Sequence, residues 1–220
     1  SEIIRHGTGP TDYWWEVTEK NGNVSYYGDV NDEGLTEHAT IGSEKGTSRW
    51  MLVKTVDTFG NSVEYEYDSD CDTGVGSGEC ISGVAGTQQY LKRITYSGFA
   101  GESGPYSVEF IRDSARNGYL RNYDNDGHNA TIDRRLDVQI DARAGFKHVT
   151  AERLKKIVVK YNDEVVRRYK LKYKVGPFGK SLLKKVIQTS ADHEKLATHT
   201  FDYHDTVTND GSYNIFGDYD

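Results

Sequence analysis

Apolar and polar residues alternate along short stretches of this chain with a period of two residues. Residues 14–17 and 24–28 are two such stretches, and Lys20-Asn21-Gly22-Asn23 separates them. Strict alternation is typical of a half-buried strand, and Asn-Gly between two alternating runs indicates a tight hairpin turn. The sequence therefore predicts a β-hairpin close to its start.

The same pattern predicts four further hairpins. Their strands are expected at residues 50–56 with 62–67, 89–96 with 106–112, 154–161 with 165–175, and 183–189 with 197–203. Residues 137–142 have the pattern of one more short strand.

Three polar segments between these strands predict loops. They are residues 29–47, 68–87 and 113–135. No amphipathic helix of three turns is apparent, although residues 149–157 could carry a short helix.

The hairpins resemble one another, which indicates a repeated unit. Their first strands contain Leu91-Lys92-Arg93-Ile94, Leu154-Lys155-Lys156-Ile157 and Leu183-Lys184-Lys185-Val186, and their second strands contain Tyr65-Glu66-Tyr67, Tyr169 to Tyr173 and Phe201-Asp202-Tyr203. A lone hairpin is marginal in water, so repeats stack to cover one another. We expect an all-β fold of repeated antiparallel β-hairpins, arranged as a curved sheet or a propeller.

Composition supports this fold class and limits the classes of protein. Sixteen Tyr and 23 Gly favour strands and turns, and hydrophobic residues make up 35% of the 220 residues. No stretch reaches the about 18 apolar residues of a membrane-spanning helix. Both ends of the sequence look cut from a longer chain.

Charge is distributed unevenly along the chain. Residues 153–185 contain twelve Lys or Arg and two acidic residues, a net charge of +10, so the rest of the chain carries −17 of the total −7. These basic residues alternate with Val, Tyr and Leu, which is typical of a solvated strand face. We therefore expect no nucleic-acid partner.

One acidic segment has the spacing of a calcium loop. Asp68, Asp70 and Asp72 alternate, and Glu79 is the twelfth residue counted from Asp68, as in an EF-hand loop. The sixth position is Thr73, where that loop requires Gly. An acidic, Gly-rich loop without metal explains the same residues, so calcium is the only cofactor suggested.

Two cysteines, Cys71 and Cys80, lie in the same segment. They could form a local disulfide if the protein is exported, and two free thiols are the alternative. No HExxH, GxSxG, phosphate-binding loop or dinucleotide motif occurs, so we expect no enzymatic activity and no catalytic residues.

The order of the motifs resembles a known group of toxin proteins. Trp50-Met51-Leu52, the turn Asp57-Thr58-Phe59-Gly60-Asn61 and Tyr65-Glu66-Tyr67-Asp68 resemble the YD-repeat hairpin of Rhs proteins and of the insecticidal Tc-toxin B component. The preceding hairpin, residues 14–28, resembles that of SpvB-type domains. The likeness extends over residues 3–205.

The end of the chain has a separate resemblance. Phe216-Gly217-Asp218-Tyr219-Asp220 is similar to the opening of an FG-GAP/VCBS repeat. The resemblances divide the chain into an SpvB/Rhs-like β domain, residues 1–205, and a linker, residues 206–220, into a truncated FG-GAP/VCBS-like repeat.

The resemblance implies a structural role. Such sheets form the shell of a secreted or cell-surface bacterial toxin, and this shell encloses a C-terminal toxin. The implied partners are other β-shell domains of the same polypeptide, a translocation component and the encapsulated toxin. The alternative is an extracellular module that binds carbohydrate or a cell surface through an aromatic platform of Trp14, Trp15, Tyr26 and Tyr27.

Overall fold

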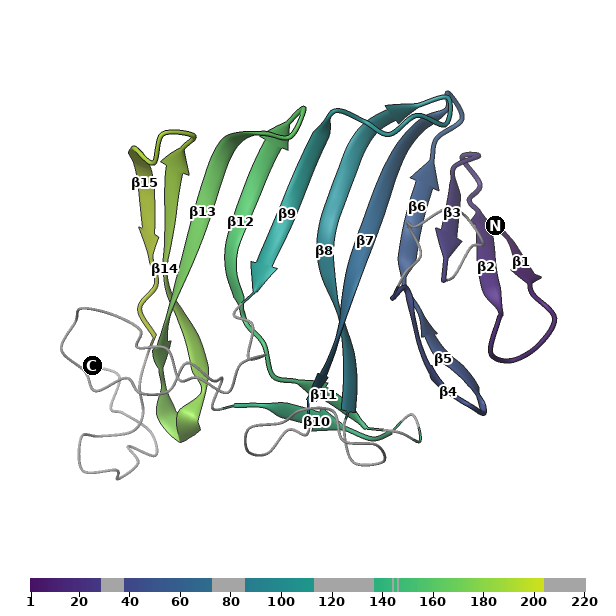
Figure 1. Cartoon of the computed structure of the whole chain (residues 1–220), viewed down its shortest axis with the longest axis horizontal. Coiled ribbons are helices and arrows are strands. Elements are labelled where there is room, and N and C mark those ends of the chain that lie inside the picture. Colours follow the sequence, from purple (N-terminus) through teal and green to yellow (C-terminus); the bar gives the residue numbers. More distant parts are fainter. Residues whose placement is uncertain (29–37, 73–85, 113–136, 144, 146, 204–220) are drawn as a thin grey trace, which may run out of the picture.

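Eleven strands form one antiparallel sheet (Figure 1). The structure is a computed structural model that describes residues 1–28, 38–72, 86–112, 137–143, 145 and 147–203. In spatial order the strands are β1 (Glu2–His6), β2 (Trp14–Thr18), β3 (Val24–Tyr27), β6 (Leu52–Val56), β7 (Asn61–Asp72), β8 (Gly86–Phe99), β9 (Tyr106–Arg112), β12 (Leu154–Tyr161), β13 (Glu164–Val175), β14 (Ser181–Ser190) and β15 (Lys195–Thr200). This order follows the sequence, so each strand pairs with its neighbours along the chain.

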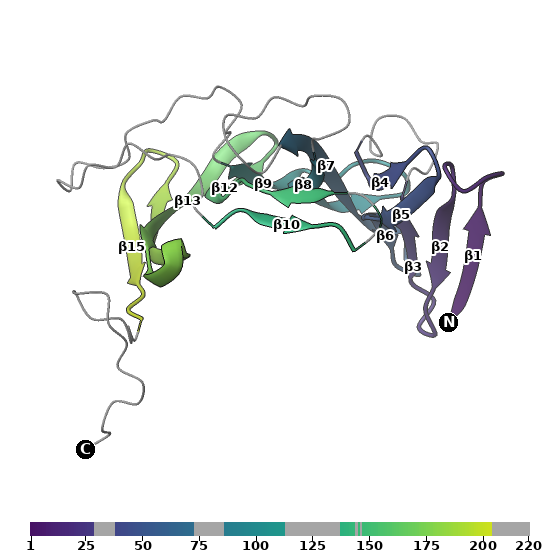
Figure 2. The ribbon, with the colours of Figure 1, turned by 90° about the horizontal axis from the view of Figure 1, so that it is seen from below.

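The sheet is curved and open. Figure 2 shows it as an arch, with β1 and β15 at the two ends. The predicted all-β fold of repeated hairpins is therefore confirmed, and it takes the form of a curved sheet. A single 3₁₀ turn, η2 (Pro177–Gly179), connects β13 to β14.

Two small hairpins interrupt the meander and pack on the sheet. The first cover hairpin is β4 (Thr40–Ser43) with β5 (Gly46–Trp50), and the second is β10 (Gln139–Asp141) with β11 (His148–Thr150). Both contact the N-terminal half of β8. Gln88 donates a hydrogen bond to the Thr150 hydroxyl, and its neighbour Gln89 donates one to the carbonyl of Thr40. Because successive strand residues point to opposite faces, the two cover hairpins lie on opposite faces of the sheet.

The buried apolar residues gather near these cover hairpins. Among the described residues they are Ala39, Ile41, Val53, Val149, Ala151 and Val158. Most other apolar side chains of the sheet are half-buried. A sheet with so small a core depends on backbone pairing and on contacts between neighbouring strands.

All five predicted hairpins are present. They are β2–β3, β6–β7, β8–β9, β12–β13 and β14–β15. In the first of them, Gly22 has a φ of 87°, a conformation that most other residues adopt only with strain. The Asn-Gly signal therefore marks a real turn.

Three predicted segments differ from the structure. The expected loop at residues 29–47 contains the first cover hairpin, because Ala39 and Ile41 are buried against the sheet. The expected loop at residues 68–87 begins after Asp72, since β7 continues in register with β8 although its residues are polar. The short helix considered for residues 149–157 does not form, because β11 and β12 take up most of this segment, and the strand predicted from residue 154 is present.

The remaining differences are at the chain ends and in the long insertion. β1 was not predicted, and it pairs with β2 over all five of its residues. The long loop expected at residues 113–135 and the linker at residues 206–220 lie outside the described residues. The division into these two parts therefore stays a prediction.

A tyrosine hydroxyl connects the two strands of three hairpins in the same way. Tyr67 donates to the carbonyl of Leu52 at 2.8 Å, Tyr173 to that of Leu154 at 2.7 Å, and Tyr203 to that of Leu183 at 2.8 Å. In each case the tyrosine belongs to the second half of the hairpin and the leucine to the first strand. This bond gives the repeated Tyr a structural role, whereas its acceptor is a backbone carbonyl and does not require Leu.

Replacing Tyr67 by Phe tests this bond. The change removes the hydroxyl and leaves the Leu52 carbonyl without its donor, so we expect the free energy of unfolding to fall by about 1 kcal/mol. Tyr65→Phe is the matched control, since it alters the same residue type two positions away on β7. The measurement is urea denaturation, and equal effects of the two changes would contradict the role of the bond.

The same tyrosine should make stability sensitive to alkaline pH. Burial, followed by the nearby Tyr65, raises the pKa of Tyr67 from 10.0 to about 12. The folded protein therefore keeps the proton that the unfolded chain loses above pH 10. We expect the contribution of Tyr67 to the free energy of unfolding to be fully present below that pH and to be lost as the pH rises towards about 12. Comparing unfolding of the wild type and Tyr67→Phe between pH 8 and about 12 measures this difference, and parallel curves would refute it.

Candidate functional site: a polar network beneath the second cover hairpin

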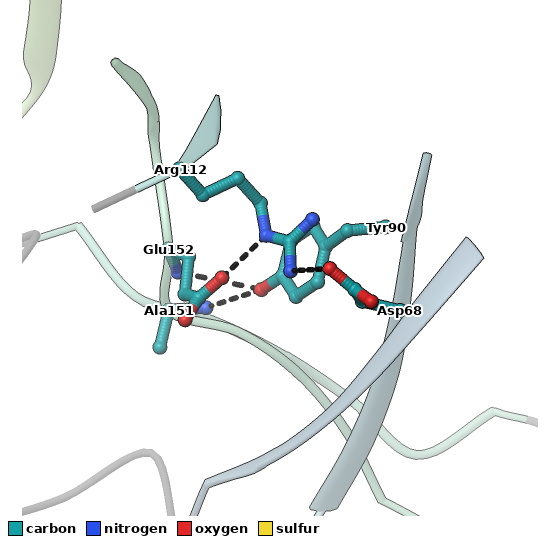
Figure 3. A network of polar contacts seen from close by, with 5 residues as sticks. All are labelled: Asp68, Tyr90, Arg112, Ala151 and Glu152. Atoms are coloured by element: carbon teal, nitrogen blue, oxygen red, sulfur yellow. Dashed lines mark hydrogen bonds and ion pairs between the residues drawn. The ribbon is translucent and has the colours of Figure 1, made fainter. Parts of the chain in front are cut away.

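A polar network joins three strands of the sheet to the segment that follows β11 (Figure 3). Arg112, at the end of β9, donates to Glu152 through Nε and to Asp68 on β7 through Nη2 at 3.1 Å. The Tyr90 hydroxyl on β8 accepts hydrogen bonds from the backbone N–H groups of Ala151 and Glu152. The network therefore connects residues that are about 40 positions apart in the sequence.

The central ion pair of this network is largely buried. The side chain of Glu152 is 4% exposed and that of Arg112 is 14% exposed, so the ion pair between them is largely withdrawn from water. The guanidinium carbon of Arg112 also lies 4.5 Å from the centre of the Tyr90 ring. A buried carboxylate requires such partners, because an unpaired charge in this position would be costly.

The described part of this network contains an arginine, two carboxylates and a tyrosine whose hydroxyl accepts two backbone donors. Arg112 contacts both carboxylates, Lys92 also lies beside Asp68, and the guanidinium of Arg112 stays protonated at physiological pH. The arrangement fixes the position of the second cover hairpin on the sheet. It provides attachment between layers, and that is the role its geometry supports.

The register of the strands gives the sheet two chemically different faces. Residues directly opposite each other on antiparallel strands lie on the same face. One face, called the apolar face, carries the rows Tyr65–Ile94–Val108–Val159 and Phe110–Ile157–Tyr169. The other, called the charged face, carries the rows Tyr26–Lys54–Glu64 and Arg93–Glu109–Val158–Arg168.

Ion pairs connect residues across much of the charged face. Lys54 lies 3.1 Å from Glu64 and Lys160 lies 2.6 Å from Glu109, both on neighbouring strands, and Arg93 on β8 lies 2.8 Å from Asp163 in the turn between β12 and β13. On the apolar face Tyr96, Tyr106 and Tyr161 form a row of rings whose centres are 5.3 and 4.9 Å apart. Apart from the two cover hairpins, all the described strands belong to the sheet itself.

The predicted calcium residues are only partly described. Asp68 lies 3.1 Å from Arg112 and 3.7 Å from Lys92, so cations of the protein already contact its carboxylate. The backbone of Asp70 and Asp72 is extended and pairs with β8, and Glu79 lies outside the described residues. Among the residues that the structure describes, no group of three or more His, Cys, Asp or Glu could hold a metal ion. The calcium site stays a prediction.

The disulfide stays a prediction as well. The backbone of Cys71 is part of β7, opposite Thr87, whereas Cys80 lies outside the described residues.

The four aromatic residues of the alternative binding platform are divided between the two faces. Trp15 and Tyr27 are opposite each other on the apolar face, whereas Trp14 and Tyr26 are on the charged face. The Trp14 ring stacks on His6, with ring centres 3.7 Å apart, and Trp15 packs edge-on against Trp50. These four rings therefore do not form one surface.

Sequence reasoning named one residue of the network, Asp68, but as a calcium ligand, and it missed the others. Arg112 ends a predicted strand, Glu152 lies in a segment considered for a short helix, and neither belongs to a recognised motif. Tyr90 precedes the repeated Leu91-Lys92-Arg93-Ile94 unit, which is the nearest signal to it. The partners are separated by a long stretch of chain, so no local spacing reveals them.

Together, the curved open sheet and its cover hairpins define a structural all-β module. The family model of the Salmonella virulence plasmid 65kDa B protein, SpvB, matches residues 2–134, and the chain belongs to the SpvB family. No curated protein sequence matches it. In the described part of the chain no helix is long and apolar enough to span a membrane.

Solved toxin structures share the fold. The crystal structure of TcdB2-TccC3-Cdc42 matches with a TM-score of 0.62 and 15% identity, over 93% of this chain and 11% of that one. The N-terminal domain of effector protein SpvB from Salmonella typhimurium strain LT2 gives 0.55 and 16%, over 88% and 62%. The Photorhabdus luminescens Tc holotoxin pore gives 0.57 and 17%, over 86% and 10%.

The chain therefore spans about a tenth of the Tc-toxin chains that it resembles and 62% of the SpvB domain. The predicted resemblance to SpvB and Tc-toxin shell domains is confirmed. These matches show that the chain shares its fold with parts of toxin proteins.

Replacing Arg112 by Met tests the network. The change leaves Glu152 buried without its cation, so we expect a loss of about 3 kcal/mol of stability. Lys92→Met is the control, because Lys92 is 53% exposed and its contact with Asp68 should contribute less than about 1 kcal/mol. Combining Arg112→Met with Glu152→Leu should recover part of the loss. Chemical denaturation measures these variants, the single change Glu152→Leu and the wild type, and strictly additive losses of the two single changes would show that the pair is not coupled.

Proposed function

We propose that this chain is a non-catalytic wall segment of a secreted or cell-surface bacterial toxin shell. The shell would enclose a C-terminal toxin and deliver it with the help of a translocation component. The neighbours of the chain in the wall would be other β-shell domains of the same polypeptide.

The amphipathic sheet is the observation that carries this proposal. A wall needs one face for contact with a further layer or with enclosed polypeptide, and one face for solvent. Here the apolar face carries half-buried Tyr65, Ile94, Val108 and Ile157, and the charged face carries paired Lys and Glu. A curved, open sheet with this division has the properties of a wall.

Both ends of the sheet offer further pairing. β1 and β15 are the outermost strands, and each pairs on one side with its neighbour in the described part of the chain. Ile3 on β1 is 65% exposed and Leu196 on β15 is 53% exposed. Edge strands with exposed apolar residues pair readily with another strand. Additional strands of a larger shell would cover them.

The relatives support the same proposal. The SpvB family and the Tc complexes are toxin proteins by their names, and the match covers most of this chain but a small part of the Tc chains. A segment of a large assembly is expected to match in this way. The absence of catalytic motifs from the sequence agrees with a structural role.

The edges provide the test. If the chain is a strip of wall without its neighbours, it should associate in solution through β1 and β15. We expect the wild type to form oligomers that grow with concentration, and Ile3→Lys with Leu196→Lys to shift it towards a monomer. A charged side chain on an edge strand opposes pairing. Light scattering on the peak eluted from size-exclusion chromatography measures the mass.

Val166→Lys is the matched control. Val166 is 50% exposed and Leu196 is 53% exposed, but Val166 lies on the interior strand β13. It should leave the association unchanged. A wild type that stays monomeric at all concentrations, or a control that dissociates as fully as the edge variant, would contradict the wall proposal.

A further inference from the structure

Four lysines form a compact group on the charged face near its C-terminal end. Lys156 on β12 lies directly opposite Lys170 on β13, and Lys172 on β13 lies directly opposite Lys185 on β14. Lys170 and Lys172 are two positions apart on one strand, so all four share one face. We call this group the lysine surface.

The lysine surface differs from the rest of the charged face. Elsewhere on that face lysines are matched with acids, as in Lys54 with Glu64 and Lys160 with Glu109. By contrast, no ion pair connects Lys156, Lys170 or Lys185 to an acid of the described residues, and the positions opposite Lys170 and Lys185 on the next strand are Ile187 and Thr200. The register places like charges opposite each other.

This arrangement has an electrostatic cost in the isolated chain. Like charges directly opposite each other on a sheet are destabilising. The charge of Lys172, then burial, then the charges of Lys155 and Lys156 lower the pKa of Lys170 from its usual value. The repulsion among these ammonium groups decreases when an anion lies over them.

We propose that the lysine surface is a docking site for an acidic polypeptide segment. Lysines alternate along β13 at about 6.8 Å and face each other across strands at about 5 Å. An extended acidic segment presents its own alternate carboxylates with the same period. Such a segment can lie along β13 and place a carboxylate between the ammonium groups.

The chemistry of the surface favours polypeptide over nucleic acid. Single-stranded nucleic acid is held by aromatic rings next to the positive charges. Here the ring of Tyr169 is on the apolar face, in register with Ile157, and the lysine rows continue with Ile187, Thr198 and Thr200. The ring of Tyr203 already has a cation partner outside the four lysines, since Lys174 Nζ lies 5.3 Å from its centre. Arg168, two positions before Lys170 on β13, donates hydrogen bonds to the carbonyls of Ser190 and Ala191. Its guanidinium is therefore already engaged and is not free to bind a phosphate group through two parallel hydrogen bonds.

The charge of the chain shows that acidic polypeptide is available. Outside residues 153–185 the chain carries a net charge of −17. Polypeptide of this composition would meet the surface wherever parts of the protein or further copies of it come together. The inference concerns the charged face alone, so it does not depend on the sheet being part of a closed shell.

The test uses the 220-residue chain and fluorescently labelled poly-L-glutamate. Binding is followed by fluorescence anisotropy over a series of salt concentrations. We expect the combined change Lys156→Gln, Lys170→Gln and Lys185→Gln to weaken binding about tenfold, since each exposed ion pair contributes about a factor of two. The affinity of the wild type should fall steeply as salt increases.

The matched control removes the same charge elsewhere. Lys20→Gln, Lys180→Gln and Lys195→Gln changes three exposed lysines away from the surface and should alter the affinity less than about twofold. The melting temperature of the lysine-surface variant should equal or exceed that of the wild type, because repulsion is relieved. This result separates loss of binding from loss of folding.

Two sets of outcomes would overturn the inference. The first is poly-L-glutamate binding that is absent, or that both triple variants reduce equally. The second is tighter binding of oligothymidylate, or of vesicles containing phosphatidylserine, through the same three lysines. Neither result bears on association through Ile3 and Leu196, so failure here is distinguishable from failure of the wall proposal.

Discussion

Backbone hydrogen bonding between neighbouring strands is the interaction on which this structure depends. Eleven strands form one sheet, and six apolar residues make up the buried core of the described chain. A single-layer sheet cannot bury both of its faces, so burial of apolar side chains contributes less to stability here than in a two-layer fold. The tyrosine hydroxyls that bind leucine carbonyls in three hairpins add a tertiary bond to this ladder.

The two cover hairpins add a second layer to the sheet beside β8. They pack on opposite faces beside β8, and adjacent residues Gln88 and Gln89 bond to one of them each. Arg112 and Glu152 then attach the second cover hairpin to the strands beneath it. Among the described residues a second layer is therefore present near β7 and β8, and the rest of the arch relies on cross-strand contacts.

A sheet of this kind is suited to extension. Its two faces have different chemistry, its edge strands carry exposed apolar residues, and part of its charged face is self-repelling. Each of these features has a free-energy cost in isolation that contact with other polypeptide would reduce. Under the wall proposal, other β-shell domains would supply these contacts, and the SpvB family and the Tc-toxin structures with the same fold are consistent with it.

The sequence by itself determined the features that depend on local spacing. Alternation and turn residues such as Asn21-Gly22 fixed all five hairpins, and the Leu and Tyr repeat indicated that the hairpins stack. Of the cover hairpins the sequence predicted only β10, as the short strand at residues 137–142. β4, β5 and β11 escaped prediction because each contains a single large apolar residue, so no alternation is visible in them.

Only the tertiary structure decided which residues meet across the sheet. The contact of Arg112 with Glu152 and the row of opposed lysines depend on strand register, which bulges shift at several positions. A bulge or a slip of one residue moves a side chain to the other face. Local patterns carry no information on register between distant segments, because it is set by the pairing of whole strands.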